Sequence, residues 1–191
     1  MDLNQTYWDQ RYQNNTTGWD TGIPSPALVQ YAENFSFDTP ILIPGAGRAH
    51  EAIFLSNHGF TNITVCDLAP TPLLQIERRE KRNPIQLIQG NFFDLNSTYD
   101  LILEQTFFCA ISPSLRSDYV RKMHELLNKE GIIAGVLFAS YFDFDGPPFG
   151  GNMEEYHSLF KNHFEILHME PCYNSIPPRQ GNELFIELRK K

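Results

Sequence analysis

Cysteine and basic side chains are scarce in this sequence, and each shortage excludes a class of protein. Only three cysteines occur in 191 residues, at positions 66, 109 and 172, with no CxxC pair. A disulfide framework is therefore not expected, and the thiols are typical of a reducing compartment. Lys and Arg number 15 against 23 Asp and Glu, a net charge of −8, which argues against a duplex-binding face.

Metal-ligand motifs and long apolar segments are also missing. The six histidines form no HxH or HExxH pattern, so we expect no metal site. The longest apolar run, 131–138, is too short to cross a bilayer, and the N-terminus lacks the basic and hydrophobic regions of a secretory signal. We expect a soluble cytoplasmic protein that works as a monomer, with no nucleic-acid or membrane partner.

Apolar residues, by contrast, are plentiful. Hydrophobic residues make up 41% and aromatic residues 13% of the chain, enough for a full core. The length predicts one domain over 1–191. Within it, an aromatic-rich N-terminal segment, 1–35, precedes a body, 36–191, in which strand and helix patterns alternate.

The alternation predicts an α/β fold. Five short apolar runs are separated by helix-length segments, which is typical of parallel βαβ units in a doubly wound sheet. Two further strands, 164–169 and 184–188, have only a loop between them, so we expect an antiparallel C-terminal hairpin. The prediction is a mostly parallel seven-stranded sheet whose first five strands are 40–43, 63–66, 85–88, 99–103 and 132–139.

A glycine turn after the first strand indicates a nucleoside ligand. Gly45-Ala46-Gly47 lets the backbone approach a ligand, and Asp67 follows twenty residues after Gly47, at the end of the second strand. An acidic side chain there accepts hydrogen bonds from ribose hydroxyls. The plainer alternatives are an ordinary strand-to-helix turn and a helix N-cap at Asp67. His50 replaces the third glycine of the dinucleotide pattern, which disfavours a diphosphate and makes an NAD-dependent reductase a weaker alternative.

Polar and aromatic residues at the ends of the third and fourth strands extend this site. Asn91 and Phe92 can bond and stack on an adenine, or else anchor the core. Glu104 and Gln105 end the fourth strand, where side chains border the ligand crevice of such sheets. Cys109 has no His or Lys beside it in the sequence to lower its pKa, so we interpret it as a buried structural thiol.

The two chain ends add further candidates. Trp8, Tyr12 and Trp19 either pack the N-terminal segment onto the sheet or cover a cationic or planar ligand. Arg179 lies in a stiff turn before the last strand, as a surface charge or as a contact to an anionic or polar substrate.

Seven short motifs together resemble one family. The chain is similar to the thiopurine S-methyltransferase superfamily of class I S-adenosylmethionine-dependent methyltransferases, and within it to the plant-type thiol/halide enzymes. The similarity extends over nearly the whole length, and TFFCAI and GPPF are its most specific parts. The motifs are YWDQRY (7–12), TGWD (17–20), IPGAG (43–47), NFF (91–93), TFFCAI (106–111), GPPF (146–149) and PRQG (178–181).

This resemblance implies a cofactor, S-adenosylmethionine, with S-adenosylhomocysteine as its product, and a place for it. The N-terminal aromatic residues would cover the cofactor, Gly45 would contact its methionine part, and Asp67 its ribose. The remaining residues assigned to the cofactor site by the resemblance are Pro44, Gly47, Leu68, Asn91, Phe92 and Glu104. The class I architecture of parallel strands closed by an antiparallel hairpin is Rossmann-like and agrees with the predicted sheet.

For the reaction we expect in-line methyl transfer to a small soft nucleophile such as a thiol, hydrosulfide, halide or thiopurine. Such acceptors are already nucleophilic, so no dedicated base is needed. We expect Arg179 and Gln105 to orient the acceptor against an apolar wall, with Glu104 as the third catalytic candidate. The acceptor-binding candidates are Trp19, Gln105, Phe108, Pro147, Pro148, Phe149 and Arg179.

Two alternatives remain at this point. An oxygen acid or a metalloid could be the acceptor, and an oxygen acceptor would need a base, for which Glu104 is the candidate. The domain could also bind the cofactor without catalysis, as a sensor.

Overall fold

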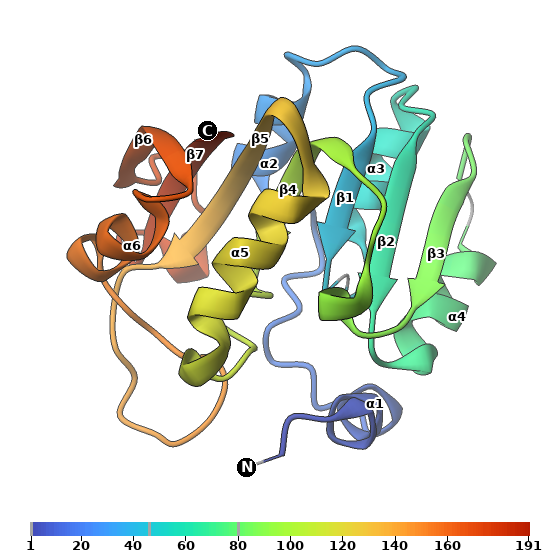
Figure 1. Cartoon of the computed structure of the whole chain (residues 1–191). Helices are drawn as coiled ribbons and strands as arrows, with labels where there is room; N and C mark the ends of the chain where they lie inside the picture. Colours follow the sequence, from blue (N-terminus) through green and yellow to red (C-terminus); the bar gives the residue numbers. More distant parts are fainter. Residues whose placement is uncertain (1, 46, 80) are drawn as a thin grey trace.

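One seven-stranded sheet organises the protein. The structure, a computed structural model, describes residues 2–45, 47–79 and 81–191. The strands lie in the order β3-β2-β1-β4-β5-β7-β6 (Figure 1). Their bounds are β1 (Ile41–Pro44), β2 (Ile63–Asp67), β3 (Ile85–Gln89), β4 (Tyr99–Gln105), β5 (Leu127–Phe138), β6 (Phe164–Pro171) and β7 (Glu183–Lys190).

The directions of the strands confirm the predicted fold class. Strands β1 to β5 pair in parallel, whereas β7 is antiparallel to both β5 and β6. The order changes direction at β1, because β2 lies on one side of it and β4 on the other. In open sheets of this kind ligands bind outside the carboxyl ends of the strands at that position.

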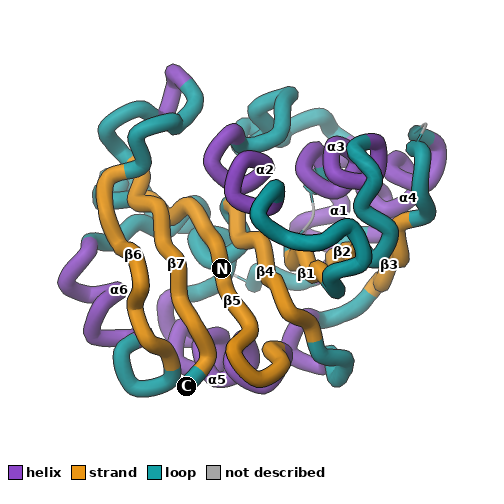
Figure 2. Tube along the Cα trace, turned by 90° about the horizontal axis from the view of Figure 1, so that it is seen from above, coloured by secondary structure: helices purple, strands orange, loops and turns teal. Residues whose placement is uncertain are grey.

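Helices cover both faces of the sheet (Figure 2). Helices α2 (Pro26–Ala32), α3 (His50–Asn57) and α4 (Pro70–Arg78) pack on one face around a core that includes Leu28 and Ile76. Helices α5 (Arg116–Leu126) and α6 (Met153–Phe160) pack on the other face. Helix α1 (Gln5–Gln13) belongs to neither layer and lies beyond the carboxyl ends of β1 and β2 (Figure 1).

The alternation of side chains along β4 decides which face each site candidate reaches. Leu101 and Leu103 belong to the core beneath α2–α4, and Ile102 belongs to the core beneath α5 and α6. Because successive side chains of a strand point to opposite faces, Glu104 follows Ile102 toward α5 and Gln105 follows Leu103 toward α2 and α3. The two neighbours therefore meet different surroundings.

Element boundaries differ from the predicted ones at three places. Strand β5 begins at Leu127, and the expected turn at 128–131 lies inside the strand, where the register with β4 shifts and Glu130 has φ 62°. Helix α4 ends at Arg78 rather than near 82. Helices α1 and α2 were not predicted, because their short segments lack a clear apolar period.

No helix of the described residues is long and apolar enough to span a membrane.

Candidate functional site

A cavity of about 980 Å³ lies at the carboxyl ends of the parallel strands. Its size is at the upper end of the roughly 300–1,000 Å³ typical of small-molecule sites. The wall comes from the N-terminal segment, the ends of β1, β2, β3 and β5, and the loops after β4, β5 and β6. Sequence-predicted residues in the wall are Trp8, Tyr12, Trp19, Gly45, Asp67, Leu68, Asn91, Phe92, Pro147, Pro148 and Arg179.

The turn after β1 requires glycine at Gly45 for two reasons. Its φ is 61°, and a Cβ atom built there would lie 2.3 Å from Cδ2 of Phe107. Gly47 also has a positive φ, 53°, and lines a second, smaller cavity together with Gly45. Ala46 lies outside the described residues. Pro44 ends β1 beside this turn and is absent from the described lining of both cavities.

Asp67, at the end of β2, presents an oxygen-rich group to the cavity. Its Oδ1 accepts a hydrogen bond from the backbone N–H of Ala69 at 2.8 Å, and its Oδ2 accepts one from Gly47 at 3.3 Å. Burial raises the pKa of this carboxyl to about 6, although those hydrogen bonds oppose the shift. A carboxylate has about four acceptor positions, so acceptor capacity remains for ligand hydroxyls.

Asn91 and Phe92 stand where β3 ends. The Asn91 side chain accepts a hydrogen bond from the N–H of Phe93 at 3.2 Å and so begins the short helix η1 (Phe92–Asp94). Phe92 is 3% exposed and packs edge-on against Phe107, with ring centroids 5.1 Å apart. An amide and an aromatic edge therefore form one end of the cavity.

Aromatic side chains of the N-terminal segment form another part of the wall. Trp19 contacts both Trp8 and Tyr12 edge-on, with centroids 5.6 Å apart in each pair. Asp9 on α1 accepts a hydrogen bond from the N–H of Thr71 at 2.9 Å, which fixes α1 to the first turn of α4. Burial is the main reason that the pKa of Tyr12 lies far above its ordinary value.

Asp20 connects this segment to the beginning of α3. Its carboxylate lies 2.6 Å from Nε of Arg48 and 2.8 Å from Nε2 of His50. Burial alone would raise the pKa of Asp20, but hydrogen bonds from His50 and from the N–H of Gly22, with the charges of His50 and Arg48, hold it below its ordinary value. His50, the departure from the dinucleotide pattern, thus holds the N-terminal segment in place.

Arg179 fixes the same segment from the other end of the sheet. It lies in the short helix η3 (Pro177–Arg179) and is 9% exposed. Its Nη2 donates to the carbonyl of Trp19 at 2.8 Å, and its Nη1 lies 3.3 Å from Oε1 of Glu183. The guanidinium also lies 5.3 Å from the ring centroid of Phe138. Arg179 also lines the large cavity, beside Pro178 and Phe138.

Glu104 is completely buried and lines neither cavity. Its Oε1 accepts hydrogen bonds from the N–H groups of Phe107 (2.9 Å) and Phe108 (3.0 Å), and its Oε2 accepts one from the hydroxyl of Tyr119 (2.7 Å). These bonds hold a turn in which Thr106 has φ 59°, a conformation unusual for a β-branched residue. The carboxylate is thus hydrogen-bonded to residues behind the cavity wall and does not face the cavity.

Gln105 faces the smaller cavity, of about 40 Å³, rather than the large one. Its Oε1 is buried and has no hydrogen-bond partner among the described residues. Trp19, Gly45 and Thr106 line both cavities, so the two spaces adjoin. An unsatisfied acceptor beside a ligand cavity is a position that a ligand donor or a water can fill.

Phe108 and Phe149 line neither cavity. Phe108 is 1% exposed and belongs to the core beneath α5 and α6. The N–H of Phe149 donates to the carbonyl of Cys109 at 2.7 Å, which joins the loop after β5 to the turn after β4. Cys109 itself lines the large cavity, and burial, together with the nearby Glu104, raises the pKa of its thiol to about 12. It is therefore a protonated thiol rather than a nucleophile.

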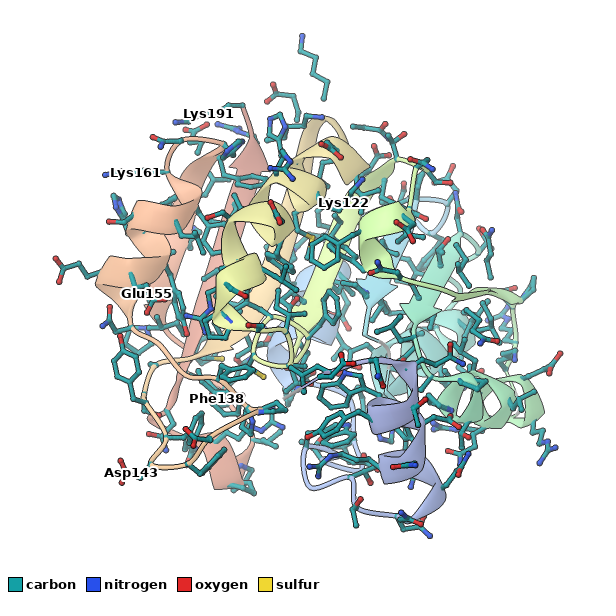
Figure 3. The ribbon with its side chains drawn as sticks, turned by 60° about the horizontal axis from the view of Figure 1, so that its bottom comes forward. Lys122, Phe138, Asp143, Glu155, Lys161 and Lys191 are labelled. Carbon is teal, nitrogen blue, oxygen red and sulfur yellow. The ribbon has the colours of Figure 1, made fainter. Side chains whose placement is uncertain are left out.

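Two residues that contact the loop after β5 or line the cavity, Arg116 and Phe138, were not singled out from the sequence. Arg116 is 6% exposed, donates to the carbonyl of Gly150 at 2.8 Å, pairs with Glu155 and lies over the ring of Phe108. Phe138 ends β5, and the loop that follows it runs past Asp143 before returning to α6 (Figure 3). No local pattern in the sequence indicates that Arg116 is buried, and only the fold shows it.

The residues of the cavity fit a nucleoside that carries a cation. Asp67 offers acceptor oxygens, the N-terminal rings offer aromatic faces and edges, and the glycine turn leaves the backbone open. Among the described residues no group of three or more His, Cys, Asp or Glu is arranged to hold a metal ion.

The comparison with known proteins decides the family. The sequence model of the thiopurine S-methyltransferase (TPMT) family matches residues 3–186, nearly the whole chain. The chain belongs to the thiopurine S-methyltransferase family. It is an S-adenosylmethionine-dependent methyltransferase, as the resemblance of its motifs implied.

Individual relatives support the same family assignment. Thiocyanate methyltransferase 1 of Arabidopsis thaliana is 24% identical, over 96% of this chain and 84% of the relative. Thiopurine S-methyltransferase of Acinetobacter baylyi is 28% identical, over 94% of each chain. The solved structure of 1,6-didemethyltoxoflavin-N1-methyltransferase from Burkholderia thailandensis superposes with a TM-score of 0.75 at 18% identity, over 98% of this chain and 87% of that one. This last likeness supports the fold.

Proposed function

We propose that this enzyme transfers the methyl group of S-adenosylmethionine to a small thiol held between Arg179 and the loop after β5. One observation carries the proposal: a single cavity extends from Asp67 and Asn91 to Pro148 and Arg179. The end at Asp67 and Asn91 suits a nucleoside. The end at Pro148 and Arg179 is mostly apolar and includes the guanidinium of Arg179. A cofactor and a small acceptor can therefore lie side by side in one cavity.

The cofactor occupies the polar end in this proposal. The ribose hydroxyls donate to Asp67, the adenine lies against Asn91, Phe92 and Leu68, and the methionine part follows the turn at Gly45 and Gly47. Trp8, Tyr12 and Trp19 exclude water from above. Aromatic faces next to a sulfonium provide favourable cation–π contacts.

The acceptor occupies the apolar end. Several uncharged side chains surround this space, which suits a thiol with a small apolar body. The charge of Arg179 is paired with Glu183, but its guanidinium has N–H groups beyond those bonded to Glu183 and Trp19, and these can donate to a thiolate. The relatives named above are methyltransferases of thiocyanate and thiopurine, and both names indicate a sulfur acceptor. The side chains of this end are Phe107, Ala110, Ile111, Leu115, Phe138, Pro147, Pro148 and Pro178.

The chain's own residues orient and enclose the reactants rather than exchange a proton with them. S-Adenosylmethionine supplies an electrophilic methyl group. Glu104 is not available as a base, because its carboxylate already accepts three hydrogen bonds behind the wall. An acceptor that arrives as a thiolate needs no base. Cys109 stays protonated and so does not compete for the methyl group.

Three assigned residues take indirect roles in the proposal. Glu104 and Phe108 support the turn after β4, and Phe149 joins the loop after β5 to it. An acceptor contact by Gln105 stays a prediction, since its amide lies in the adjoining cavity and touches a ligand only if the ligand extends there.

At the level of the whole chain we propose a cytoplasmic monomer of one domain, in which segment 1–35 covers the cofactor and 36–191 forms the body. The three cysteines are unpaired and buried, which supports a reducing compartment. The contacts of Asp9, Asp20 and Trp19 with the body support a covering role for the N-terminal segment.

The test is product formation from a panel of acceptors. We expect S-methylated product from thiophenol or a thiopurine with S-adenosylmethionine, and a lower kcat/KM with hydrosulfide or iodide, which leave the apolar end unfilled. The Asp67→Asn variant serves as the control, because it should lose cofactor binding while the acceptor end stays intact. No product from any thiol, with the cofactor bound, would refute the acceptor class.

A further inference from the structure

Glu104 is a buried carboxylate whose charge has no partner in the fold. The groups that donate to it are two backbone N–H groups and the hydroxyl of Tyr119, all of them neutral. Within residues 2–45, 47–79 and 81–191, no Lys, Arg or His forms an ion pair with it. Burying a charge without a counter-ion is costly, so an uncompensated carboxylate beside a ligand cavity calls for a functional explanation.

Among the described residues, the groups that contact Glu104 directly are neutral. Tyr119 faces it from α5, and Cys109 lies on the turn that its hydrogen bonds hold. On β5 and β7 its neighbours are Gly135 and Ile186, where a Cβ atom on Gly135 would lie 3.0 Å from Cβ of Glu104.

Two cations act on the nearby Cys109, and both are already paired. Arg116 pairs with Glu155, and Arg179 pairs with Glu183. Burial raises the pKa of the Glu104 carboxyl to about 7, against the hydrogen bonds from Phe108, Tyr119 and Phe107. Its charge is therefore free to respond to a ligand near neutral pH.

The position of the turn brings this carboxylate close to the reaction centre. Thr106, Phe107 and Cys109, which belong to the turn that the carboxylate holds, line the cavity, whereas Glu104 does not. The Phe107 ring packs directly on Gly45, since a Cβ atom on Gly45 would overlap it. One layer of residues thus separates Glu104 from the space between the glycine turn and the acceptor end, and a charge acts strongly across such a layer of low dielectric.

We propose that Glu104 is the counter-charge by which the site distinguishes the methylsulfonium cofactor from its uncharged, demethylated product. The inference rests on the cofactor placement proposed above. S-Adenosylmethionine carries a permanent positive charge at sulfur, and S-adenosylhomocysteine does not. The carboxylate attracts the first and is indifferent to the second, which favours binding of the donor and release of the product. Glu104 is a positioning residue in this role, since it touches neither ligand.

The coupling between proton binding and ligand binding predicts a second measurable difference between the two ligands. A bound cation stabilises the carboxylate, so binding of S-adenosylmethionine releases part of a proton from Glu104 near its pKa, whereas S-adenosylhomocysteine does not. The affinity for S-adenosylmethionine accordingly rises with pH through about 7. Asp67 also titrates in the cavity, at about 6, but it meets the same ribose in both ligands.

The deciding experiment compares ligands on the Glu104→Gln variant. Its amide keeps the size of the side chain, and its oxygen still accepts from Phe107 and Phe108. By calorimetric titration we expect a loss of about tenfold in affinity for S-adenosylmethionine, the factor that about 1.4 kcal/mol represents. Sinefungin, in which a protonated amine replaces the methylsulfonium, should lose the same factor. The affinity for S-adenosylhomocysteine should change by less than about twofold.

The matched control is Tyr119→Phe, which removes one hydrogen bond and keeps the charge. At a pH well above the pKa of Glu104 it should preserve the ratio of the two affinities, whereas the pH at which the affinity for S-adenosylmethionine rises should move upward, because one hydrogen bond that stabilises the carboxylate is lost. Equal losses for both ligands in Glu104→Gln would mean that the residue only holds the turn, and the proposal would be overturned.

A measurement on the unmodified enzyme needs no variant to fold. Titrations at neutral pH in two buffers of different ionisation enthalpy should show more proton release with S-adenosylmethionine than with S-adenosylhomocysteine. Equal proton release with the two ligands would overturn the proposal. If the unmodified enzyme bound neither ligand, the cofactor placement itself would have failed, which is a different result.

Discussion

Arg179 donates a hydrogen bond to the backbone carbonyl of Trp19, 160 positions earlier in the chain, at 2.8 Å. The same guanidinium pairs with Glu183 and lies over Phe138. One side chain therefore joins the N-terminal segment, the end of β5 and the start of β7 around the acceptor end of the cavity. The contact couples the position of the N-terminal segment to the end of the cavity where we propose that the acceptor binds.

Replacing Arg179 by Ala should weaken both stability and acceptor binding. The change leaves Glu183 buried without its partner, which costs about 3 kcal/mol in the free energy of unfolding. Urea denaturation measures this loss, and the double variant Arg179→Ala with Glu183→Gln should recover part of it. In the double variant the KM for the thiol should still be raised at least about tenfold, because the cation remains absent. A normal KM there would show that Arg179 only supports the fold.

Asp67→Asn should separate cofactor binding from stability. The neutral amide loses the charge-assisted bonds to ribose, which are worth about 1.5–3 kcal/mol, so the affinity for S-adenosylmethionine should fall at least about tenfold. Calorimetric titration measures this loss. Unchanged affinity would remove Asp67 from the cofactor site.

The same variant gives a pH signature with a definite sign. The folded-state pKa of Asp67, about 6, lies above the ordinary 3.8, so folded protein holds the proton more tightly. Above about pH 6 the buried Asp67 carboxylate is charged, and its burial lowers the free energy of unfolding by the full amount. As pH falls from about 6 toward 4 the carboxyl takes up a proton in the folded protein, so the free energy of unfolding rises. We expect Asp67→Asn to gain stability relative to the unmodified protein at about pH 8, with the gain shrinking toward pH 4. A gain that grew on acidification would contradict this.

Gly45→Ala should disrupt the contact between the glycine turn and the turn after β4. The new methyl group would overlap the ring of Phe107 and impose a positive φ on alanine. A loss of about 1–3 kcal/mol in the free energy of unfolding is expected, with weaker cofactor binding. Gly18→Ala is the control for stability, since a Cβ atom there meets nothing within 4 Å. Similar thermal stability in both variants would refute the close packing.

Arg116→Lys should affect the acceptor and spare the cofactor. Lysine keeps the charge but cannot bond the Gly150 carbonyl and Glu155 together while lying over Phe108. We expect a higher KM for the thiol, a stability loss of about 1–2 kcal/mol, and an unchanged dissociation constant for S-adenosylmethionine. A loss of cofactor affinity equal to the change in KM would show a general loosening of the fold instead.

The sheet could be predicted from the sequence because its signals are local. The apolar runs of β1 to β5 and the absence of a crossover helix between β6 and β7 determine strand directions by simple rules. The polar end of the cavity could be located for the same reason, since Gly45 and Asp67 end neighbouring strands. These positions needed only the rule that ligands bind at the carboxyl ends of parallel strands.

The acceptor end depends on contacts between distant segments, which no local pattern contains. Arg116, an apparent surface residue of a helix, is buried against Gly150. Glu104 and Gln105 are neighbours in sequence, but strand alternation turns one toward α5 and the other toward α3. The class of sheet could be predicted, whereas the strand order and the faces reached by these two side chains required the structure.

We propose that the large cavity holds S-adenosylmethionine beside a thiol acceptor. A rapid-quench experiment tests this, in which enzyme preloaded with methyl-labelled S-adenosylmethionine is mixed with thiophenol. We expect one turnover to give one labelled thioether and one S-adenosylhomocysteine per active site, with little label on the protein. Tight cofactor binding without labelled thioether, or label accumulating on Cys109, would contradict the account.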